Sequence, residues 1–505
     1  MARKPKLNRR GFLKGATALG AGSALSMMAP RGVRPAHADD RTRFLIVLGA
    51  AGGASILDGP MAIRASESDS ADTLNTFADQ QVQSFEQTEL RAVDLERDAL
   101  GQIPMAFRSN QSDFVRKHGE QMMVATTLRT SVNHSIGQRR SVTGNEIWQG
   151  RTLQEIVANE YGQDYVLPNV HLTLGTGFTD RGTDASLPSW VFGEPIADAA
   201  LWPLALDSSK GLRTSFDPKV LQHARTLRSN LERKAPFSRV FADAQRIKYW
   251  QHLRGGPREA LEAKDLINKL MLFPDSPNTP LADHGLTGSA SAARAREVFP
   301  DYAIDPLQAQ AALAFLLLRY RIAVTVTLGP NFNPILREGV GLNGGSIPEG
   351  GLLNPPIAFD FSHQGHRSVQ ALMWQRMYSI ADGLIELLRD EEYADGESFW
   401  DRSMIYIATD FGRSKTRPAR SNEFATGHDL NNGVTFISPL VRGGKVLGGV
   451  DPNTGMTYGF DPTTGAADPG RTMEESEIFA GIVHALGVDT SGTGLPDMRA
   501  MRKLA

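Results

Sequence analysis

Two short stretches in the C-terminal half of the chain combine aspartate and histidine residues that can bind a divalent metal ion. The five residues are Asp360, His363 and His366 in the first stretch, and Asp410 and His428 in the second. Carboxylate oxygens and imidazole nitrogens are common ligands of Zn²⁺, Mn²⁺ and similar ions. We therefore predict that these five residues include the ligands of a metal site.

Expected strands place several of these residues at one edge of a sheet. Residues 403–409 form an apolar, β-branched run typical of a buried strand, and the run ends directly at Asp410. A similar run over 433–439 follows His428. In open α/β sheets, ligands bind beyond the carboxyl ends of the strands. His134, which follows an apolar run over 121–128, is a further candidate ligand.

The rest of the chain alternates short apolar runs with amphipathic segments. This alternation predicts an α/β fold with a mainly parallel central sheet that helices cover on both faces. Further strands are expected over 43–48 and 321–328. Helices are expected over 151–161, 219–234, 258–272, 306–318, 368–388 and 474–486.

Three regions interrupt this pattern. Residues 187–300 alternate helical stretches with Pro and Asp breaks and have no long flanking linker, so they are expected to form a helical insertion within one domain, 39–505. Residues 329–358 are rich in Gly, Pro and Asn and predict a long loop. Residues 63–120 are polar and charge-mixed, and are expected to form surface loops and short helices.

The composition excludes several classes of partner and site. Of the 54 basic residues, eight lie in positions 1–38, which contain no acidic residue; the remaining 46 face 56 acidic residues, a net charge of −10 for 39–505. This charge argues against a nucleic-acid partner. The chain contains no cysteine, which excludes disulfides, thiolate metal sites and a cysteine nucleophile.

The first 38 residues have the order of an export signal. Residues 8–14, Asn-Arg-Arg-Gly-Phe-Leu-Lys, resemble the twin-arginine motif, and a mildly apolar segment follows over 15–29. Ala36-His37-Ala38 fits a cleavage site. We therefore expect recognition by the twin-arginine export machinery, a periplasmic or secreted location, and no membrane span after cleavage.

Several of these motifs together resemble the exported domain-of-unknown-function family 1501, part of the alkaline-phosphatase-like (sulfatase-like) superfamily. They include a double glycine after the first strand, the Asp-Phe-Gly-Arg block over 410–413, a His-Asp dipeptide before a later strand, and the last helix. The resemblance is strongest over 320–490. It implies an α/β sandwich with one or two divalent ions at the carboxyl edge of its sheet.

Mapped onto this sequence, the resemblance implies Asp360 and His363 as the first ligand pair, Asp410 as the next acidic ligand and His428 as the late histidine. The chain departs from the family pattern in three ways. Ser55 stands where the family has an aspartate, which would remove one of two metals unless Asp58 substitutes.

The other two departures concern histidines. The first pair is spaced Asp-x-x-His, which leaves His363 and His366 as alternative ligands, and the late His-Asp order is reversed. The alternative to a metal site is structural: Asp410 would cap a helix, and the loop histidines would form only local hydrogen bonds.

The chemistry implied by such a site is hydrolysis of phosphate or sulfate esters. A divalent ion would act as a Lewis acid, Arg413 with Arg139 or Arg140 would bind an oxyanion, and Ser55 or Ser135 is the candidate nucleophile. The alternative is a non-catalytic exported protein of the same fold that binds a ligand or partner.

Overall fold

The computed structural model describes residues 41–95, 107–205, 218–241, 244, 266–277, 281–282, 288–330, 359–419 and 421–503. The predicted signal peptide 1–38 lies outside this part of the chain, as do residues 331–358 of the predicted loop and parts of the predicted insertion. Among the described residues, no helix has both the length and the apolar character needed to cross a membrane.

An eight-stranded sheet forms the centre of the molecule, in the order β14-β4-β13-β10-β1-β7-β5-β6. The strands are β1 (Phe44–Ala50), β4 (Met122–Leu128), β5 (Asn169–His171), β6 (Glu194–Pro195), β7 (Thr325–Leu328), β10 (Ser403–Thr409), β13 (Asn431–Ile437) and β14 (Lys445–Leu447). Within this sheet β13 is antiparallel to both of its neighbours, and the other described pairings are parallel. The predicted α/β class with a mainly parallel sheet is confirmed.

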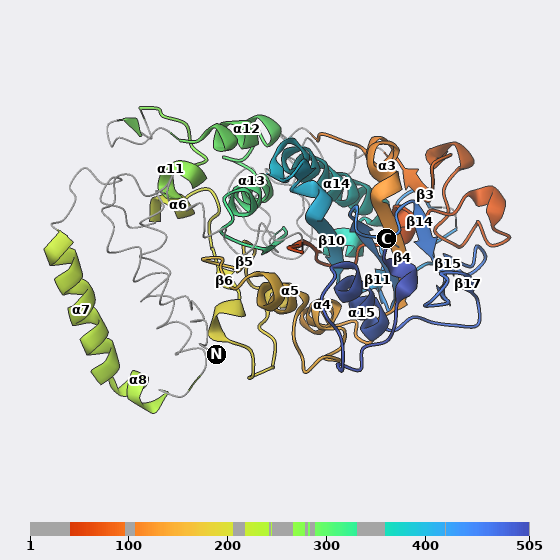
Figure 1. The fold of residues 1–505 in the computed structure, drawn as a ribbon. Helices are drawn as coiled ribbons and strands as arrows, with labels where there is room; N and C mark the ends of the chain where they lie inside the picture. Colours follow the sequence, from red (N-terminus) through yellow and green to blue (C-terminus); the bar gives the residue numbers. More distant parts are fainter. Residues whose placement is uncertain are drawn as a thin grey trace.

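Helices lie on both sides of this sheet (Figure 1). One layer contains α4 (His134–Thr143), α5 (Leu153–Tyr161) and α15 (Glu475–Ala485); the other contains α3 (Gln111–His118), α13 (Pro306–Arg319) and α14 (His366–Asp390). Local sequence sets the helix starts. The Asp305 carboxylate accepts a hydrogen bond from the Leu307 amide (3.0 Å) and Pro306 occupies the first turn of α13.

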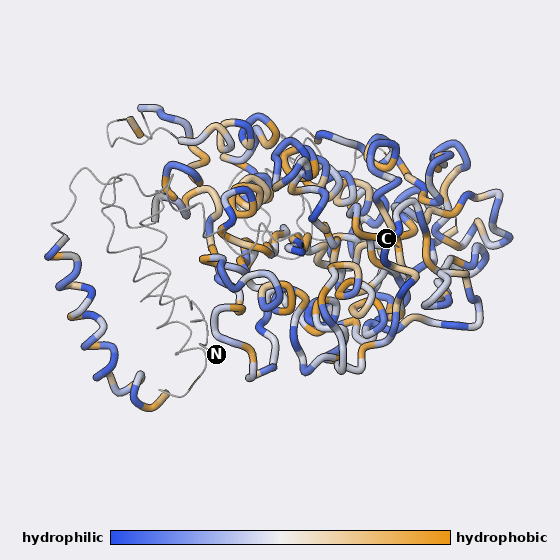
Figure 2. The backbone as a smooth tube through the Cα atoms, viewed as in Figure 1, coloured by the Kyte–Doolittle hydropathy of each residue, from blue (hydrophilic) through white to orange (hydrophobic). Residues whose placement is uncertain are grey.

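The core explains why the central strands are apolar without alternation. All seven residues of β1 and all seven of β10 are buried, because helices cover both faces of the sheet. Figure 2 shows hydrophobic segments gathered between the helix layers, whereas α7 (Pro218–Lys234) is largely hydrophilic.

Smaller elements surround the sheet. Residues 63–120, expected to be loops and short helices, contain a hairpin of β2 (Val82–Phe85) and β3 (Thr88–Val93) in addition to α3. Two further two-stranded sheets pair β8 (Glu392–Ala394) with β9 (Glu397–Ser398), and β11 (Gly412–Arg413) with β12 (His428–Asp429). A three-stranded sheet contains β15 (Gly449–Val450), β16 (Thr457–Phe460) and β17 (Ala467–Asp468).

The predicted insertion, 187–300, is mostly helical in its described part, but it also supplies β6, which pairs with β5 at one edge of the central sheet. It contains α6 (Trp202–Ala205), α7, α8 (Pro236–Val240), α11 (Leu266–Leu270) and α12 (Ala290–Val298). Both α11 and α12 pack against α13, which joins this region to one helix layer. Its assignment as an insertion within a single domain stays a prediction.

Candidate metal centre

Four segments that are distant in sequence meet at one edge of the sheet. Since β13 is antiparallel to both β10 and β4, the strands β1, β4 and β10 run in the same direction and end at this edge, whereas β13 begins there. His134 follows β4, Asp410 follows β10 and His428 precedes β13. The short helix η9 (Phe359–His363), which leads into α14, adds Asp360.

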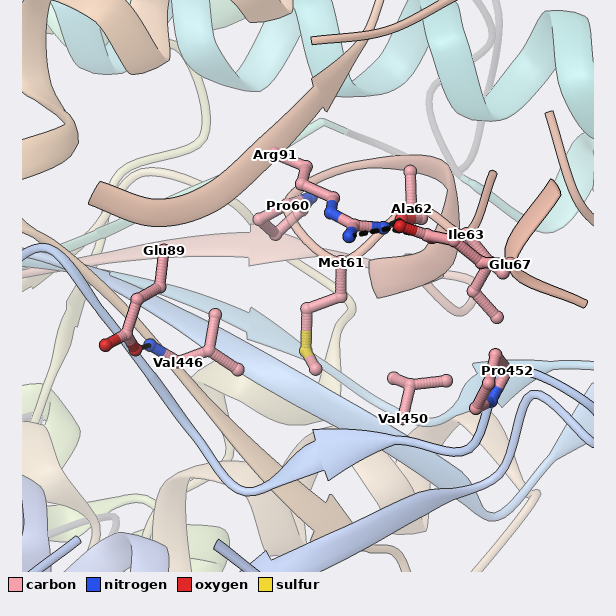
Figure 3. A pocket seen from close by; sticks show the side chains of 10 residues that line it. All are labelled: Pro60, Met61, Ala62, Ile63, Glu67, Glu89, Arg91, Val446, Val450 and Pro452. Atoms are coloured by element: carbon pink, nitrogen blue, oxygen red, sulfur yellow. Dashed lines mark hydrogen bonds and ion pairs between the residues drawn. The ribbon is translucent and has the colours of Figure 1, made fainter. Parts of the chain in front are cut away.

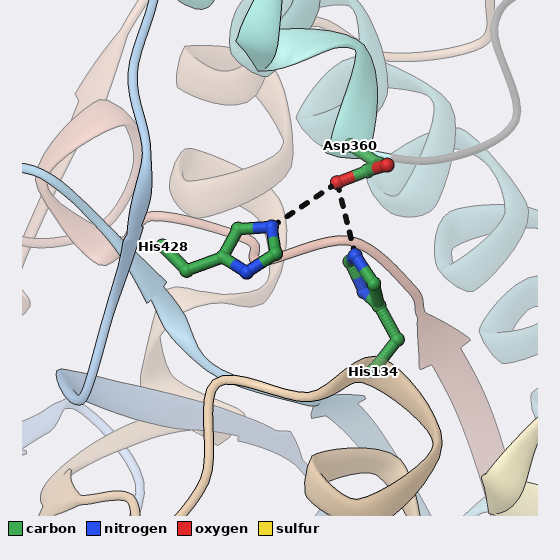
Figure 4. A group of neighbouring side chains, drawn as sticks. All are labelled: His134, Asp360 and His428. Atoms are coloured by element: carbon green, nitrogen blue, oxygen red, sulfur yellow. Dashed lines mark ion pairs between the residues drawn. The ribbon is translucent and has the colours of Figure 1, made fainter.

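His134, Asp360 and His428 form a group whose candidate ligand atoms all lie within 4.8 Å of one another (Figure 4). Asp360 Oδ1 is 3.3 Å from His134 Nε2, 3.4 Å from His363 Nε2 and 3.6 Å from His428 Nε2. Tetrahedral zinc with ligands at about 2.1 Å places any two ligand atoms roughly 3.4 Å apart. The separations around Asp360 Oδ1 therefore suit a single divalent ion.

Hydrogen bonds behind the two imidazoles fix which nitrogen faces this ion position. His134 Nδ1 lies 2.8 Å from Asp410 Oδ2, and His428 Nδ1 donates to the carbonyl oxygen of Val132 at 2.9 Å. Each ring therefore directs Nε2 toward Asp360. A second partner on the other ring nitrogen is typical of metal-binding histidines.

The start of α4 holds His134 in place. Asn133 caps the helix, because its side-chain oxygen accepts a hydrogen bond from the Ile136 amide (3.2 Å). Gly137, one turn after His134, lets the helix approach the end of β10, since a Cβ atom there would lie 2.7 Å from the Asp410 carbonyl oxygen. His134 is thus fixed in the first turn of a helix packed against the sheet edge.

Asp410 is fully buried beside the group and joins it to the double-glycine turn. Its carboxylate accepts hydrogen bonds from the amides of Gly52 (3.0 Å) and Gly53 (2.7 Å) as well as contacting His134. Both glycines have positive φ, and a Cβ atom on Gly52 would lie 2.1 Å from the Asp360 amide nitrogen. The structure shows Asp410 positioning His134; its predicted role as a direct ligand stays a prediction.

His363 and Arg413 complete the surroundings of Asp360. His363 Nε2 lies 2.8 Å from His428 Nε2 and 3.2 Å from Arg413 Nη1. Because His428 Nδ1 donates to the Val132 carbonyl, neutral His428 has its lone pair on Nε2, the nitrogen that faces His363. His363 Nε2 therefore either donates to His428 or accepts from Arg413, according to its tautomer.

The Arg413 guanidinium is buried and points toward protein atoms. It donates to Asp360 Oδ1 at 2.9 Å, to the Thr426 carbonyl at 3.3 Å and to the Gly52 carbonyl. These contacts make it a positioning residue for Asp360. Its predicted role in binding a substrate oxyanion stays a prediction.

His366 lies in a separate buried network. Its Nε2 is 2.8 Å from Asp58 Oδ2, and its Nδ1 is 2.8 Å from Thr426 Oγ1. Asn75 also donates to Asp58, at 3.0 Å. Of the two histidines left as alternatives by the sequence, His363 is therefore the one that lies beside Asp360.

The predicted nucleophiles have different surroundings. Ser55 is buried; its amide donates to Gln370 Oε1 (2.9 Å), and its carbonyl accepts from Trp374 Nε1 (3.0 Å), so it contacts α14. Ser135 is exposed and directly follows His134 in the first turn of α4. Ser135 therefore adjoins His134 in the sequence, whereas the Ser55 side chain forms a hydrogen bond with the buried Asp58.

The two arginines considered as anion ligands are bonded elsewhere. Arg139 Nε donates to Glu146 at 2.7 Å, and Arg140 Nη1 donates to Thr130 Oγ1 at 2.8 Å. Their predicted role in oxyanion binding stays a prediction.

The electrostatics of the group separate its histidines into two classes. Burial disfavours the charged form of His134, but hydrogen bonds to Asp360 and Asp410 and the charges of these carboxylates outweigh it and raise the pKa of His134 to about 9. Burial and the charge of Arg413 instead lower the pKa of both His363 and His428. Burial also opposes ionisation of Asp360, yet His134 and Arg413 hold the pKa of its carboxyl well below the usual range.

A separate cleft of about 380 Å³ lies over β3 and β14 (Figure 3). Met61, Val446 and Val450 contribute apolar surface to it. Its charged side chains are paired, with Arg91 contacting Glu67 (2.6 Å) and Lys445 contacting Glu89. His134, Asp360 and His428 do not line this cleft, so the cleft is separate from the candidate metal centre.

Comparison with known proteins adds no family to this picture. No protein-family model matches the chain, and no curated protein matches it.

Proposed function

We propose that this protein is an exported, metal-dependent hydrolase of phosphate or sulfate esters with an alkaline-phosphatase-like architecture. The observation that supports this most directly is the convergence of three imidazoles on Asp360 Oδ1 at the carboxyl edge of a mostly parallel sheet. His134, Asp360 and His428 would hold the ion, with His363 beside them. Bound there, a divalent ion would act as a Lewis acid toward an ester oxygen and lower the pKa of water.

The charges near the centre favour an anionic substrate once the ion is present. Asp360 and Asp410 contribute two negative charges, and Arg413 contributes one positive charge. A divalent ion makes this local sum positive, which suits a phosphoryl or sulfuryl group. Hydrogen bonds that hold His134 against Asp410, and Asp360 against Arg413, keep the ligands oriented before substrate arrives.

The contacts favour Ser135 over Ser55 as the serine that could attack an ester. Ser55 is buried and its backbone is bonded to α14, whereas Ser135 is exposed beside His134. Water is the other nucleophile consistent with a metal-dependent hydrolase. Replacing Ser135 with alanine separates the two, because turnover persists only if water attacks directly.

Metal analysis followed by turnover assays tests the proposal. Protein folded in producing cells is expected to contain about one zinc or manganese ion per chain and to hydrolyse a generic aryl phosphate or aryl sulfate. The variants Asp360→Asn and His134→Asn should lose metal and turnover together. His484→Asn is a matched control, because His484 lies on α15 and bonds to Thr490 at 2.9 Å. A metal-free protein with no turnover after addition of zinc or manganese would refute the hydrolase.

The second candidate is a non-catalytic exported protein of the same architecture that binds a ligand or partner. The inward orientation of Arg413 favours it, since this buried guanidinium bonds to protein atoms. Stoichiometric zinc binding without hydrolysis of any tested phosphate or sulfate ester would support this candidate.

A further inference from the structure

Four large apolar side chains are exposed on the segments that carry two of the candidate ligands. They are Leu128, Val132, Ile136 and Leu430, each 37–45% exposed. Val132 and Ile136 flank His134 at a distance of two residues, and Leu430 is two residues beyond His428. Contiguous apolar surface on a folded protein commonly marks a binding site.

Backbone contacts bring these two segments together. The Val132 carbonyl accepts the hydrogen bond from His428 Nδ1 at 2.9 Å, and the Arg129 amide donates to the Leu430 carbonyl at 2.7 Å. Leu128 is paired with Asn431, the residue after Leu430. The segments that carry these four side chains therefore meet beside the metal centre, and we call the four residues the apolar rim.

Helix packing does not account for the exposed Val132. It immediately precedes the cap Asn133, a position from which an apolar side chain often packs against the fourth helical residue. In α4 that fourth residue is Gly137, which offers no side chain. Gly137 is itself required by the close approach to Asp410. Val132 is consequently exposed next to His134 without the usual intrahelical contact.

We propose that the apolar rim binds the hydrocarbon part of an amphiphilic ester whose anionic head lies at the metal centre. This inference rests on the proposed hydrolase function and specifies its substrate class: phosphate or sulfate esters of apolar alcohols or phenols. The anionic head would meet the divalent ion, and the alkyl or aryl group would cover the side chains of Val132 and Leu430. Small hydrophilic esters would use the metal centre without gaining from the rim.

A series of alkyl esters tests this substrate class. For zinc-loaded mature protein acting on methyl, butyl, hexyl and octyl phosphate, or on the matching sulfates, kcat/KM should rise with chain length. The expected increase is roughly twofold for each half-buried methylene and about fourfold for each fully buried one. Calorimetry with the non-hydrolysable hexyl and methyl phosphonates supplies a readout independent of turnover, because the hexyl compound should bind more tightly and with a more negative heat-capacity change.

Variants localise the effect. Val132→Thr preserves side-chain shape and Leu430→Asn removes apolar surface, so each should reduce the ratio of hexyl to methyl phosphate kcat/KM. Leu227→Asn on α7 is the matched control, because Leu227 is also an exposed leucine (52%) but lies on a different element. This variant should keep the ratio unchanged.

Failure of this inference and failure of the hydrolase proposal give different results. Turnover that is independent of chain length would overturn the apolar rim and leave the hydrolase standing. Absence of turnover for every ester would overturn the hydrolase, and the rim would then be supported by tighter binding of the hexyl phosphonate or overturned by equal binding of both phosphonates.

Discussion

Binding of one zinc ion at pH 7.5 is expected to displace about one proton from His134. In the metal-free protein this imidazole lies between two carboxylates, 2.8 Å from Asp410 and 3.3 Å from Asp360, and its pKa is raised to about 9. Zinc must use the Nε2 lone pair, so the proton on that nitrogen has to leave. His428, whose pKa is lowered by burial and by Arg413, is already neutral and has no proton to release.

The magnitude follows from the pKa of about 9. At pH 7.5, 1.5 pH units below this value, roughly 97% of His134 is protonated. Proton competition then weakens apparent zinc affinity about 30-fold, or ~2 kcal/mol, relative to pH values well above 9. The logarithm of the apparent binding constant should therefore rise by about one per pH unit between roughly pH 7 and 9.

Isothermal titration calorimetry measures this proton directly. Zinc is titrated into metal-free protein at pH 7.5 in buffers with different ionisation enthalpies, and the slope of observed enthalpy against buffer enthalpy gives the number of protons released. Two variants form a matched pair, because each removes one candidate ligand. His134→Asn should weaken binding and lower the proton count by about one, whereas His428→Asn should weaken binding and leave the count near that of the unmodified protein.

The opposite pattern would refute this reasoning. If the unmodified protein releases no proton at pH 7.5, His134 is either neutral in the metal-free state or absent from the coordination sphere. If both variants release the same number of protons, the proton comes from another group, and the assignment of His134 as the protonated ligand is wrong.

Three further predictions concern the scaffold of the site. Gly52→Ala should destabilise the fold by more than ~2 kcal/mol and weaken zinc binding, because the new Cβ would lie 2.1 Å from the Asp360 amide nitrogen. Gly175→Ala is the control, since Gly175 also has a positive φ but has open space around it; it should lower the free energy of unfolding in urea by only about 1 kcal/mol. His366→Asn should lower the free energy of unfolding by about 2 kcal/mol, because the buried Asp58 carboxylate loses the imidazole partner 2.8 Å away, yet leave zinc affinity within tenfold. His363→Asn should instead weaken zinc binding and leave stability nearly unchanged. The same loss of affinity in both variants would contradict these assignments. Burial lowers the pKa of Lys415 to about 8 from an ordinary 10.5, so the unfolded chain binds more protons than the folded protein between these pH values. The free energy of unfolding should therefore rise with pH from 8 to 10.5, by as much as ~3 kcal/mol relative to the variant Lys415→Met. Parallel plots of unfolding free energy against pH for the two proteins would disprove this.

Much of the fold could be predicted because the core strands and helices have strong local signals. The strand expected over 403–409 coincides with β10, and the helix expected over 306–318 ends one residue before α13 does. The strand expected from residue 321 begins at Thr325, because Arg321 adopts a positive φ and the Ile322 and Ala323 amides bond back to the end of α13. A turn that reuses the last helical carbonyls gives no hydrophobic pattern of its own.

The candidate site was harder to predict, since it depends on contacts between distant segments. The sequence identified Asp360, His363 and His428 from residue type and nearby strands, and the structure brings them together. It gave less weight to His134, although that residue also follows a strand. It could not separate His363 from His366, because the deciding partner of His366 is Asp58, 308 residues earlier in the chain.

Strand direction was likewise not encoded in the local pattern. The run after His428 was expected in a mainly parallel sheet, and β13 is antiparallel to both neighbours. This reversal is what places His428, which precedes its strand, at the same edge as residues that follow theirs. Hydrophobic periodicity predicts that a strand exists, and pairing direction is decided by the chain connections around it.

The hydrogen bond between Val132 and His428 joins residues 296 positions apart in the chain. A metal pocket closed by such a contact has high contact order, so it cannot exist in a ribosome-bound or partly folded chain that lacks β13. An ion that binds only the complete pocket would stabilise the native state by mass action, and would not stabilise partly folded states in which the sheet is incomplete. Chelation of the ion would therefore lower the free energy of global unfolding, and would destabilise the strands on the opposite side of the sheet together with the site.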